Sequence, residues 1–132
     1  MMTEDKCLQT VLVVDDEALV LKYTTSVISG LGYKKVLKAR SAQEARAVLL
    51  AERVSLIISD VSLPDGDGRQ IVRETLEQNA GSTGVLITGF SQGELHLPPD
   101  LAGVVQCLEK PFTADDISHL LAETFERREA LA

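Results

Sequence analysis

Five polar residues stand at or just after the ends of short apolar runs, and their types could together carry out phosphoryl chemistry. They are Asp15, Asp16, Asp60, Thr88 and Lys110. Neighbouring carboxylates repel one another unless they are protonated or share a cation, and hard oxygen ligands favour Mg²⁺. A metal beside a lysine and a hydroxyl can neutralise a phosphoryl group, and a carboxylate can be the nucleophile that forms an aspartyl phosphate. The adjacent pair Asp15 and Asp16 is better suited to hold metal, which leaves Asp60 as the acceptor.

Taken singly, each of these residues also has an ordinary structural interpretation. Asp60 precedes a turn that contains Pro64 and two glycines, and aspartate is a common turn residue. The acidic pair could cap a helix, Thr88 could be a strand-end hydroxyl, and Lys110 could be a surface charge. The chemical interpretation therefore requires a fold that brings these side chains to one place.

The pattern of apolar residues predicts strands that could position them. Short β-branched runs with little alternation are typical of strands buried on both faces of a parallel sheet. We predict such strands at residues 10–14, 34–39, 54–59, 85–88 and 104–108. Helical spacing predicts helices at residues 17–31, 41–53, 67–78 and 113–128. Between the last two strands, Gly93 and the prolines that follow should leave any helix at 92–97 short or absent.

Alternating strands and helices make an α/β fold the expected architecture, with a doubly wound five-stranded parallel sheet and helices on both faces. In such a sheet the carboxyl ends of the strands share one edge, where ligands bind. The five polar residues should therefore converge there. The chain has 132 residues, and we expect one domain at residues 10–128, after a polar lead of residues 1–9 and before a tail of residues 129–132.

Composition narrows the classes of partner. The net charge of -7 argues against nucleic acid or an anionic membrane as a direct partner and favours a divalent cation. The two cysteines, Cys7 and Cys107, have neither zinc-site spacing nor a disulfide framework. No apolar run approaches the roughly 18 residues of a membrane span, and the chain begins without the regions of a signal peptide. We expect a cytoplasmic protein with no membrane partner.

The sequence resembles the response regulator receiver domains of two-component signal transduction over about residues 10 to 128. The matching marks are the acidic pair in Val13-Val14-Asp15-Asp16-Glu17, the Asp-x-x-Leu-Pro-x-x-x-Gly stretch at 60–68, Thr88 followed by a small residue, and Lys110-Pro111-Phe112. The resemblance implies a flavodoxin-like sheet with strand order 2-1-3-4-5.

The same resemblance implies roles for individual residues. Asp60 would accept a phosphoryl group from the phosphohistidine of a histidine kinase or of a histidine phosphotransfer protein. Mg²⁺ would lie on Asp16, Asp60 and the backbone carbonyl of Ser62, with Asp15 as outer support. This chemistry would make the chain a phosphoprotein that carries an aspartyl phosphate.

Two further residues would respond to the phosphate. Lys110 would pair with it, and Thr88 would move to form a hydrogen bond with it. The bond between Lys110 and Pro111 is expected to be cis, which is cheap only before proline.

The sequence departs from the family at its output switch. Receivers usually carry an aromatic residue three positions before the lysine, where this chain has Cys107. A small, soft side chain cannot sweep the same volume. Phe90, two residues after Thr88, could take over this role, or it could be a loop residue that covers the core edge.

The leading hypothesis is a phosphorylation-dependent switch in a two-component system or phosphorelay. We expect no output domain in this chain, so that it acts through an unknown output protein or is a receiver cut from a larger chain such as a hybrid kinase. It would not be an enzyme beyond catalysing its own phosphorylation and dephosphorylation. One alternative is a degenerate receiver that binds partners independently of phosphate. The other is a Mg²⁺-dependent phosphohydrolase, although such enzymes commonly place an Asp-x-Asp nucleophile after the first strand.

Overall fold

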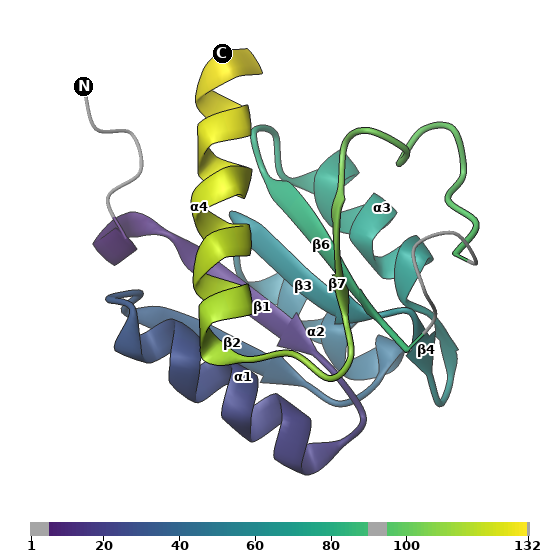
Figure 1. Cartoon of the computed structure of the whole chain (residues 1–132). Helices are drawn as coiled ribbons and strands as arrows, with labels where there is room; N and C mark the ends of the chain where they lie inside the picture. Colours follow the sequence, from purple (N-terminus) through teal and green to yellow (C-terminus); the bar gives the residue numbers. More distant parts are fainter. Residues whose placement is uncertain (1–5, 90–94, 132) are drawn as a thin grey trace.

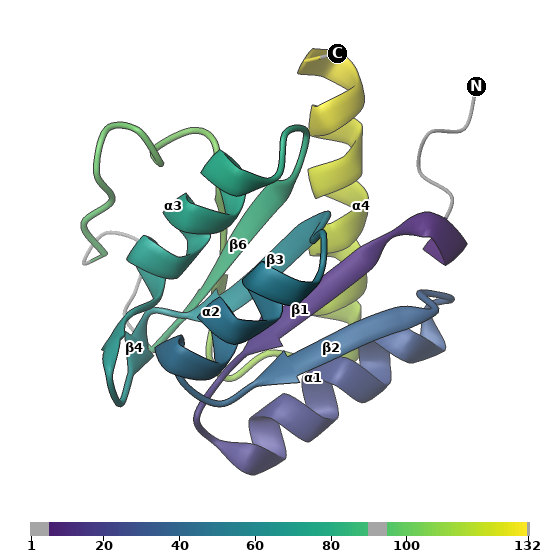
Figure 2. The same cartoon turned by 180° about the vertical axis from the view of Figure 1, so that it is seen from behind.

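A five-stranded parallel sheet lies between two layers of helices (Figures 1 and 2). The computed structural model describes residues 6–89 and 95–131. The strands are β1 (Thr10–Val14), β2 (Lys35–Ala39), β3 (Leu56–Asp60), β4 (Ser62–Leu63), β5 (Gly66–Asp67), β6 (Thr83–Thr88) and β7 (Gln106–Glu109). The helices are the 3-10 turn η1 (Lys6–Leu8) and the α-helices α1 (Ala18–Gly30), α2 (Ala42–Ala51), α3 (Gly68–Gln78) and α4 (Ala114–Leu131).

The strand order of the main sheet is β2-β1-β3-β6-β7. It corresponds to the predicted order 2-1-3-4-5, because the small β4–β5 hairpin lies outside this sheet, and all neighbouring pairs are parallel. The fold class predicted from the sequence is confirmed. The strand β2 is at an edge, as the lysines in and before it (Lys34, Lys35 and Lys38) indicate, and β1 and β3 lie in the interior of the sheet.

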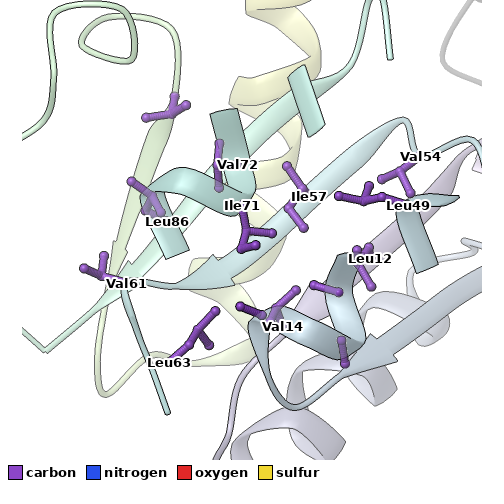
Figure 3. Close-up of a cluster of buried hydrophobic side chains, with 14 of the residues drawn as sticks. Leu12, Val14, Leu49, Val54, Ile57, Val61, Leu63, Ile71, Val72 and Leu86 are labelled. Carbon is purple, nitrogen blue, oxygen red and sulfur yellow. The ribbon is translucent and has the colours of Figure 1, made fainter. Parts of the chain in front are cut away.

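Strand alternation divides the core between the two faces of the sheet. Leu12 and Val14 point to the face covered by α2 and α3, where they meet Ile57, Ile71 and Leu86 (Figure 3). Val11 and Val13 on the same strand belong to the other core, on the face covered by α1 and α4 (Figure 1). Because both faces are covered, the central strands are apolar throughout, and their polar residues are confined to the strand ends.

The loop at residues 60–68, which we call the acceptor loop, caps the helices on both sides of it. Asp65 accepts hydrogen bonds from the amides of Ala42 and Gln43 in the first turn of α2, at 2.7 and 2.9 Å. Asp67 is the N-cap of α3 and accepts from the amide of Arg69 at 2.8 Å. These bonds satisfy helix amides that have no partner within the helix. The loop is therefore fixed to both α2 and α3.

The segment at residues 95–105, which we call the cross-over segment, contains turns and no helix. This agrees with the prediction that a fourth helix would be short or absent, although residues 92–94 lie outside the described residues. Two arginines of α3 hold the segment: Arg69 donates to the carbonyl of His96 at 2.6 Å, and Arg73 forms a two-pronged ion pair with Asp100. Its Leu101 is buried in the core beneath.

Some boundaries differ from the sequence prediction. The last strand begins at Gln106 rather than 104, because Val104 and Val105 complete a turn whose amides donate to the carbonyl of Leu101. The β4–β5 hairpin was not predicted, since its strands of two residues are too short to show periodicity. Among the described residues, no helix is both long enough and apolar enough to cross a membrane.

Candidate functional site

The predicted polar residues lie along the carboxyl edge of the sheet. Asp15 and Asp16 follow β1, Asp60 is the last residue of β3, Thr88 is the last residue of β6, and Lys110 follows β7. One carboxylate oxygen from each of the three aspartates lies within 4.8 Å of the others. The backbone amide of Lys110 donates a hydrogen bond to the backbone carbonyl of Thr88 at 2.8 Å. This bond joins the ends of the last two strands of the main sheet.

Asp60 is held through both of its carboxylate oxygens. Asp60 is buried, with 8% of its surface exposed to solvent. Oδ1 accepts a hydrogen bond from the amide of Ser62 at 3.0 Å, and Oδ2 lies 2.8 Å from Nζ of Lys110. The carboxylate therefore has a fixed orientation at the mouth of the sheet edge. The metal role of the Ser62 backbone carbonyl stays a prediction.

Gly68 fixes the backbone of Asp60 from the far end of the acceptor loop. The amide of Gly68 donates to the carbonyl of Val61 at 2.7 Å. A Cβ atom on Gly68 would lie 1.8 Å from the carbonyl oxygen of Asp60, a distance that no side chain can adopt. Position 68 thus requires glycine because the start of α3 touches the backbone of the acceptor.

The acidic pair after β1 combines a buried and an exposed carboxylate. Asp15 is fully buried, whereas Asp16 is exposed. Oδ1 of Asp15 accepts a hydrogen bond from the amide of Glu17 at 2.9 Å, and Oδ2 lies 3.2 Å from Nζ of Lys110. Burial raises the pKa of Asp15 above its ordinary value, although the Glu17 amide and the Lys110 ammonium act in the opposite direction.

The ammonium of Lys110 is shared among three carboxylates. Besides Asp60 and Asp15, it contacts Oε1 of Glu17 at 2.5 Å. Burial works to lower the pKa of Lys110, but its hydrogen bonds to Asp60 and Glu17 outweigh that effect and hold the pKa above the ordinary value. The peptide bond between Lys110 and Pro111 is cis. Sequence reasoning did not select Glu17, because it is separated from Lys110 by 93 positions in the sequence and no local pattern links the two residues.

The donor set fits a divalent cation. The carboxylates of Asp15, Asp16 and Asp60 form the cluster, and Glu17 adds a fourth negative charge beside Lys110, so negative charge is in excess among the described residues of this site. Among the described residues, the buried Oδ2 of Asp15 has no hydrogen-bond donor. An unbalanced group of hard oxygen ligands at a partly open edge is the arrangement that Mg²⁺ favours.

Of the three residues expected to transmit a signal, the structure describes Thr88 and Cys107. Thr88 is 1% exposed at the end of β6. Cys107 is partly buried, packs against the core beneath α2 and α3, and has a thiol whose pKa is raised by burial. Phe90 lies outside the described residues. The roles of all three in an output switch stay predictions.

Comparisons of the chain with a family model and with curated proteins point to the same family. The model of the response regulator receiver domain matches residues 11–122. The chain is 32% identical over 107 residues to the transcriptional regulatory protein PdtaR of Mycobacterium tuberculosis, which covers 81% of this chain and 52% of PdtaR. It spans about half or less of the length of the curated relatives that it matches first.

Solved structures agree with this match. A CheY-like response regulator receiver domain from Methanospirillum hungatei JF-1 has a TM-score of 0.78 at 24% identity, over 95% of this chain and 99% of that one. The chemotaxis response regulator CheY4 of Vibrio cholerae also has a TM-score of 0.78, at 25% identity, over 88% of this chain and 98% of that one.

Proposed function

Because the chain belongs to the response regulator receiver domain family, we propose that it is a phosphorylation-dependent switch whose phosphoryl acceptor is Asp60. The observation that carries the proposal is the carboxylate of Asp60, oriented by an amide on one oxygen and by Lys110 on the other, inside a cluster of acids. The donor would be a histidine kinase or a histidine phosphotransfer protein, and an output protein would read the modified state.

The proposed transfer is a displacement at phosphorus. A carboxylate oxygen of Asp60 attacks the phosphorus of a phosphohistidine, forming an O–P bond while the P–N bond breaks and its electron pair returns to the imidazole nitrogen. Lys110, which lies 2.8 Å from Asp60, would pair with the phosphoryl oxygens. The amide of Ser62 keeps the carboxylate from rotating, so that little ordering is needed at the moment of transfer.

The metal site forms part of the proposal. Asp15, Asp16 and Asp60 would hold Mg²⁺, which when bound neutralises negative charge on the phosphoryl oxygens. Asp15 is oriented for this by the amide of Glu17. Its buried carboxylate, whose pKa is raised without a cation, would gain most from one.

The conformational change on phosphorylation would begin at the carboxyl ends of β6 and β7. We propose that Thr88 moves to bond the phosphoryl group and that the change spreads to the cross-over segment, β7 and α4. An order or packing change in one segment is the usual form of such switches. The cross-over segment contains no helix, so a partner that binds there would meet turns held by Arg69 and Arg73. The proposed function also implies a cytoplasmic location, because a phosphohistidine donor is an intracellular protein.

The proposal is tested by incubating the protein with Mg²⁺ and phosphoramidate, or with beryllium fluoride, and following it by mass spectrometry and NMR. The wild type should gain one phosphoryl group, Asp60→Asn should gain none, and Asp65→Asn in the same loop should behave as the wild type. An unmodified wild type with an intact fold would support a phosphate-independent binding module instead. Rapid turnover of many phosphate esters would support a phosphohydrolase.

A further inference from the structure

We propose that Glu17 restrains Lys110 in the unmodified protein and so limits how readily the site accepts an anionic phosphoryl group. Glu17 would be a positioning residue that acts through Lys110. The proposal rests on the proposed function, and it assigns a role to a side chain that neither holds the metal nor receives the phosphoryl group. Its starting observation is the contact between Oε1 of Glu17 and Nζ of Lys110 at 2.5 Å.

The ammonium of Lys110 already contacts three carboxylates before any phosphoryl group arrives. An ammonium has three N–H donors. Two of them donate to Glu17 and Asp60, and Oδ2 of Asp15 lies 3.2 Å away without accepting a hydrogen bond. A phosphoryl group that takes more than one N–H donor of Lys110 must therefore displace a carboxylate that already accepts from it.

Exposure identifies which carboxylate leaves. The side chain of Asp15 is 0% exposed and that of Asp60 is 11% exposed, whereas that of Glu17 is 59% exposed. Withdrawing Asp15 would leave a buried charge without its cation, which is costly, and Asp60 is the acceptor itself. Glu17 can return to water at little cost, so it is the partner that an incoming anion displaces.

The surroundings of Glu17 leave room for that movement. A groove of about 470 Å³ opens beside the site, and Glu17 and Lys110 form one end of it. Its walls are the apolar side chains of Leu19, Val20, Tyr23, Pro111 and Phe112. The carboxylate can leave Lys110 toward the groove or the solvent without displacing the core.

Helix capping does not explain why a glutamate stands at this position. Glu17 is the N-cap of α1, yet its side chain makes no capping hydrogen bond. The residues that cap well are short, such as Ser, Thr, Asp and Asn. The longer side chain of Glu17 instead reaches Lys110, which follows β7 at the other end of the sequence.

A quantitative expectation follows from the exposure of the pair. Neutralising Glu17 removes the ion pair that holds one donor of Lys110. Contacts between partly exposed charges typically change an equilibrium by about two- to fivefold. Glu17→Gln should therefore tighten beryllium fluoride binding by about two- to fivefold and speed phosphorylation by phosphoramidate by a similar factor.

The experiment is a double-mutant cycle on the full chain. The dissociation constant of beryllium fluoride is measured by NMR for the wild type, Glu17→Gln, Lys110→Met and the double variant, with Mg²⁺ saturating for each protein. Amide spectra confirm that each variant is folded. Glu109→Gln is the matched control, because it removes the same charge from an exposed residue next to Lys110 in sequence. Glu17→Asp keeps the charge but shortens the side chain by one methylene.

The proposal predicts tighter binding for Glu17→Gln, no effect of that change in the Lys110→Met background, and no effect of Glu109→Gln. Glu17→Asp should behave like Glu17→Gln, because the shorter carboxylate loses the contact. The proposal is overturned if Glu17→Gln binds with unchanged or weaker affinity, if its gain persists without Lys110, if Glu109→Gln gives the same gain, or if Glu17→Asp matches the wild type. A wild type that binds no beryllium fluoride would instead refute the proposed function, and this inference with it.

Discussion

Replacing Gly68 by alanine should destabilise the protein and disturb its acceptor, although residue 68 contributes no side chain to the site. The added Cβ would lie 1.8 Å from the carbonyl oxygen of Asp60 and 2.8 Å from its carbonyl carbon. Attractive contacts between carbon atoms lie at about 3.5–4.0 Å. Either the start of α3 or the end of β3 must therefore move by more than an ångström.

The size of the effect follows from where that movement has to occur. Overpacking a core typically costs about 1–3 kcal/mol. Gly68 meets the backbone of a fully buried central strand rather than a flexible side chain, so we expect a value near the upper end. Alanine recovers part of this loss, because glycine is up to about 1 kcal/mol less favourable in a helix. The net loss should be about 2 kcal/mol.

Urea unfolding measures this loss directly. With a slope of about 1–3 kcal/mol per molar urea, the midpoint should fall by about 1–2 M. Gly30→Ala is the matched control, since Gly30 ends α1 and its Cβ would meet nothing within 4 Å. That variant should be unchanged or slightly more stable.

The same variants test whether α3 positions the acceptor. In its folded state, Gly68→Ala should bind beryllium fluoride more weakly, because the backbone that carries Asp60 has shifted, whereas Gly30→Ala should bind as the wild type does. A Gly68→Ala protein with the midpoint and the beryllium fluoride affinity of the wild type would refute the reasoning.

Three further predictions follow from contacts around the site. Asp65, whose pKa is lowered by its hydrogen bonds to the amides of α2, stabilises the fold above its unfolded pKa, and this contribution is lost as the pH falls through the lower folded value. Asp65→Asn should thus be less stable than the wild type at pH 7, with the gap closing in acid, as urea titrations at several pH values would check. Asp15→Asn should weaken Mg²⁺ binding by about 10- to 100-fold, measured by calorimetry, because it removes a buried carboxylate that supports the metal ligands. Arg69→Ala should speed hydrogen exchange of the turn amides of Leu101 and Ala102 by up to about tenfold, since it removes a charged hydrogen bond to the cross-over segment; unchanged exchange there would contradict this role.

The fold could be predicted because the apolar runs, and the glycine, proline and polar residues that end them, mark most of the strands and helices. In the main sheet, the first strand was predicted at its observed bounds and the other four within about two residues, because a strand buried on both faces has few polar residues to obscure its ends. The parallel direction of the strands, which follows from the alternation of strands and helices, then placed the aspartates and Lys110 along one edge. The order of the strands was implied by the resemblance to receiver domains.

What could not be predicted depends on distances across the chain. The contact of Glu17 with Lys110 joins two ends of the domain, and no local pattern marks it. Gly68 was recognised as part of a motif, but its close approach to Asp60 appears only in three dimensions. Likewise, the arginines of α3 showed helical periodicity without revealing that they hold the cross-over segment.

The caps supplied by the acceptor loop bear on how this stretch can vary in evolution. Three aspartates stand within eight positions, and a reader of sequences would be tempted to count all of them as reactive. Asp65 and Asp67 face helix amides, so drift at these two positions should be tolerated wherever another short side chain can accept the same bonds. Only Asp60 should be intolerant of every replacement, and a survey of natural variation should separate the two kinds of constraint.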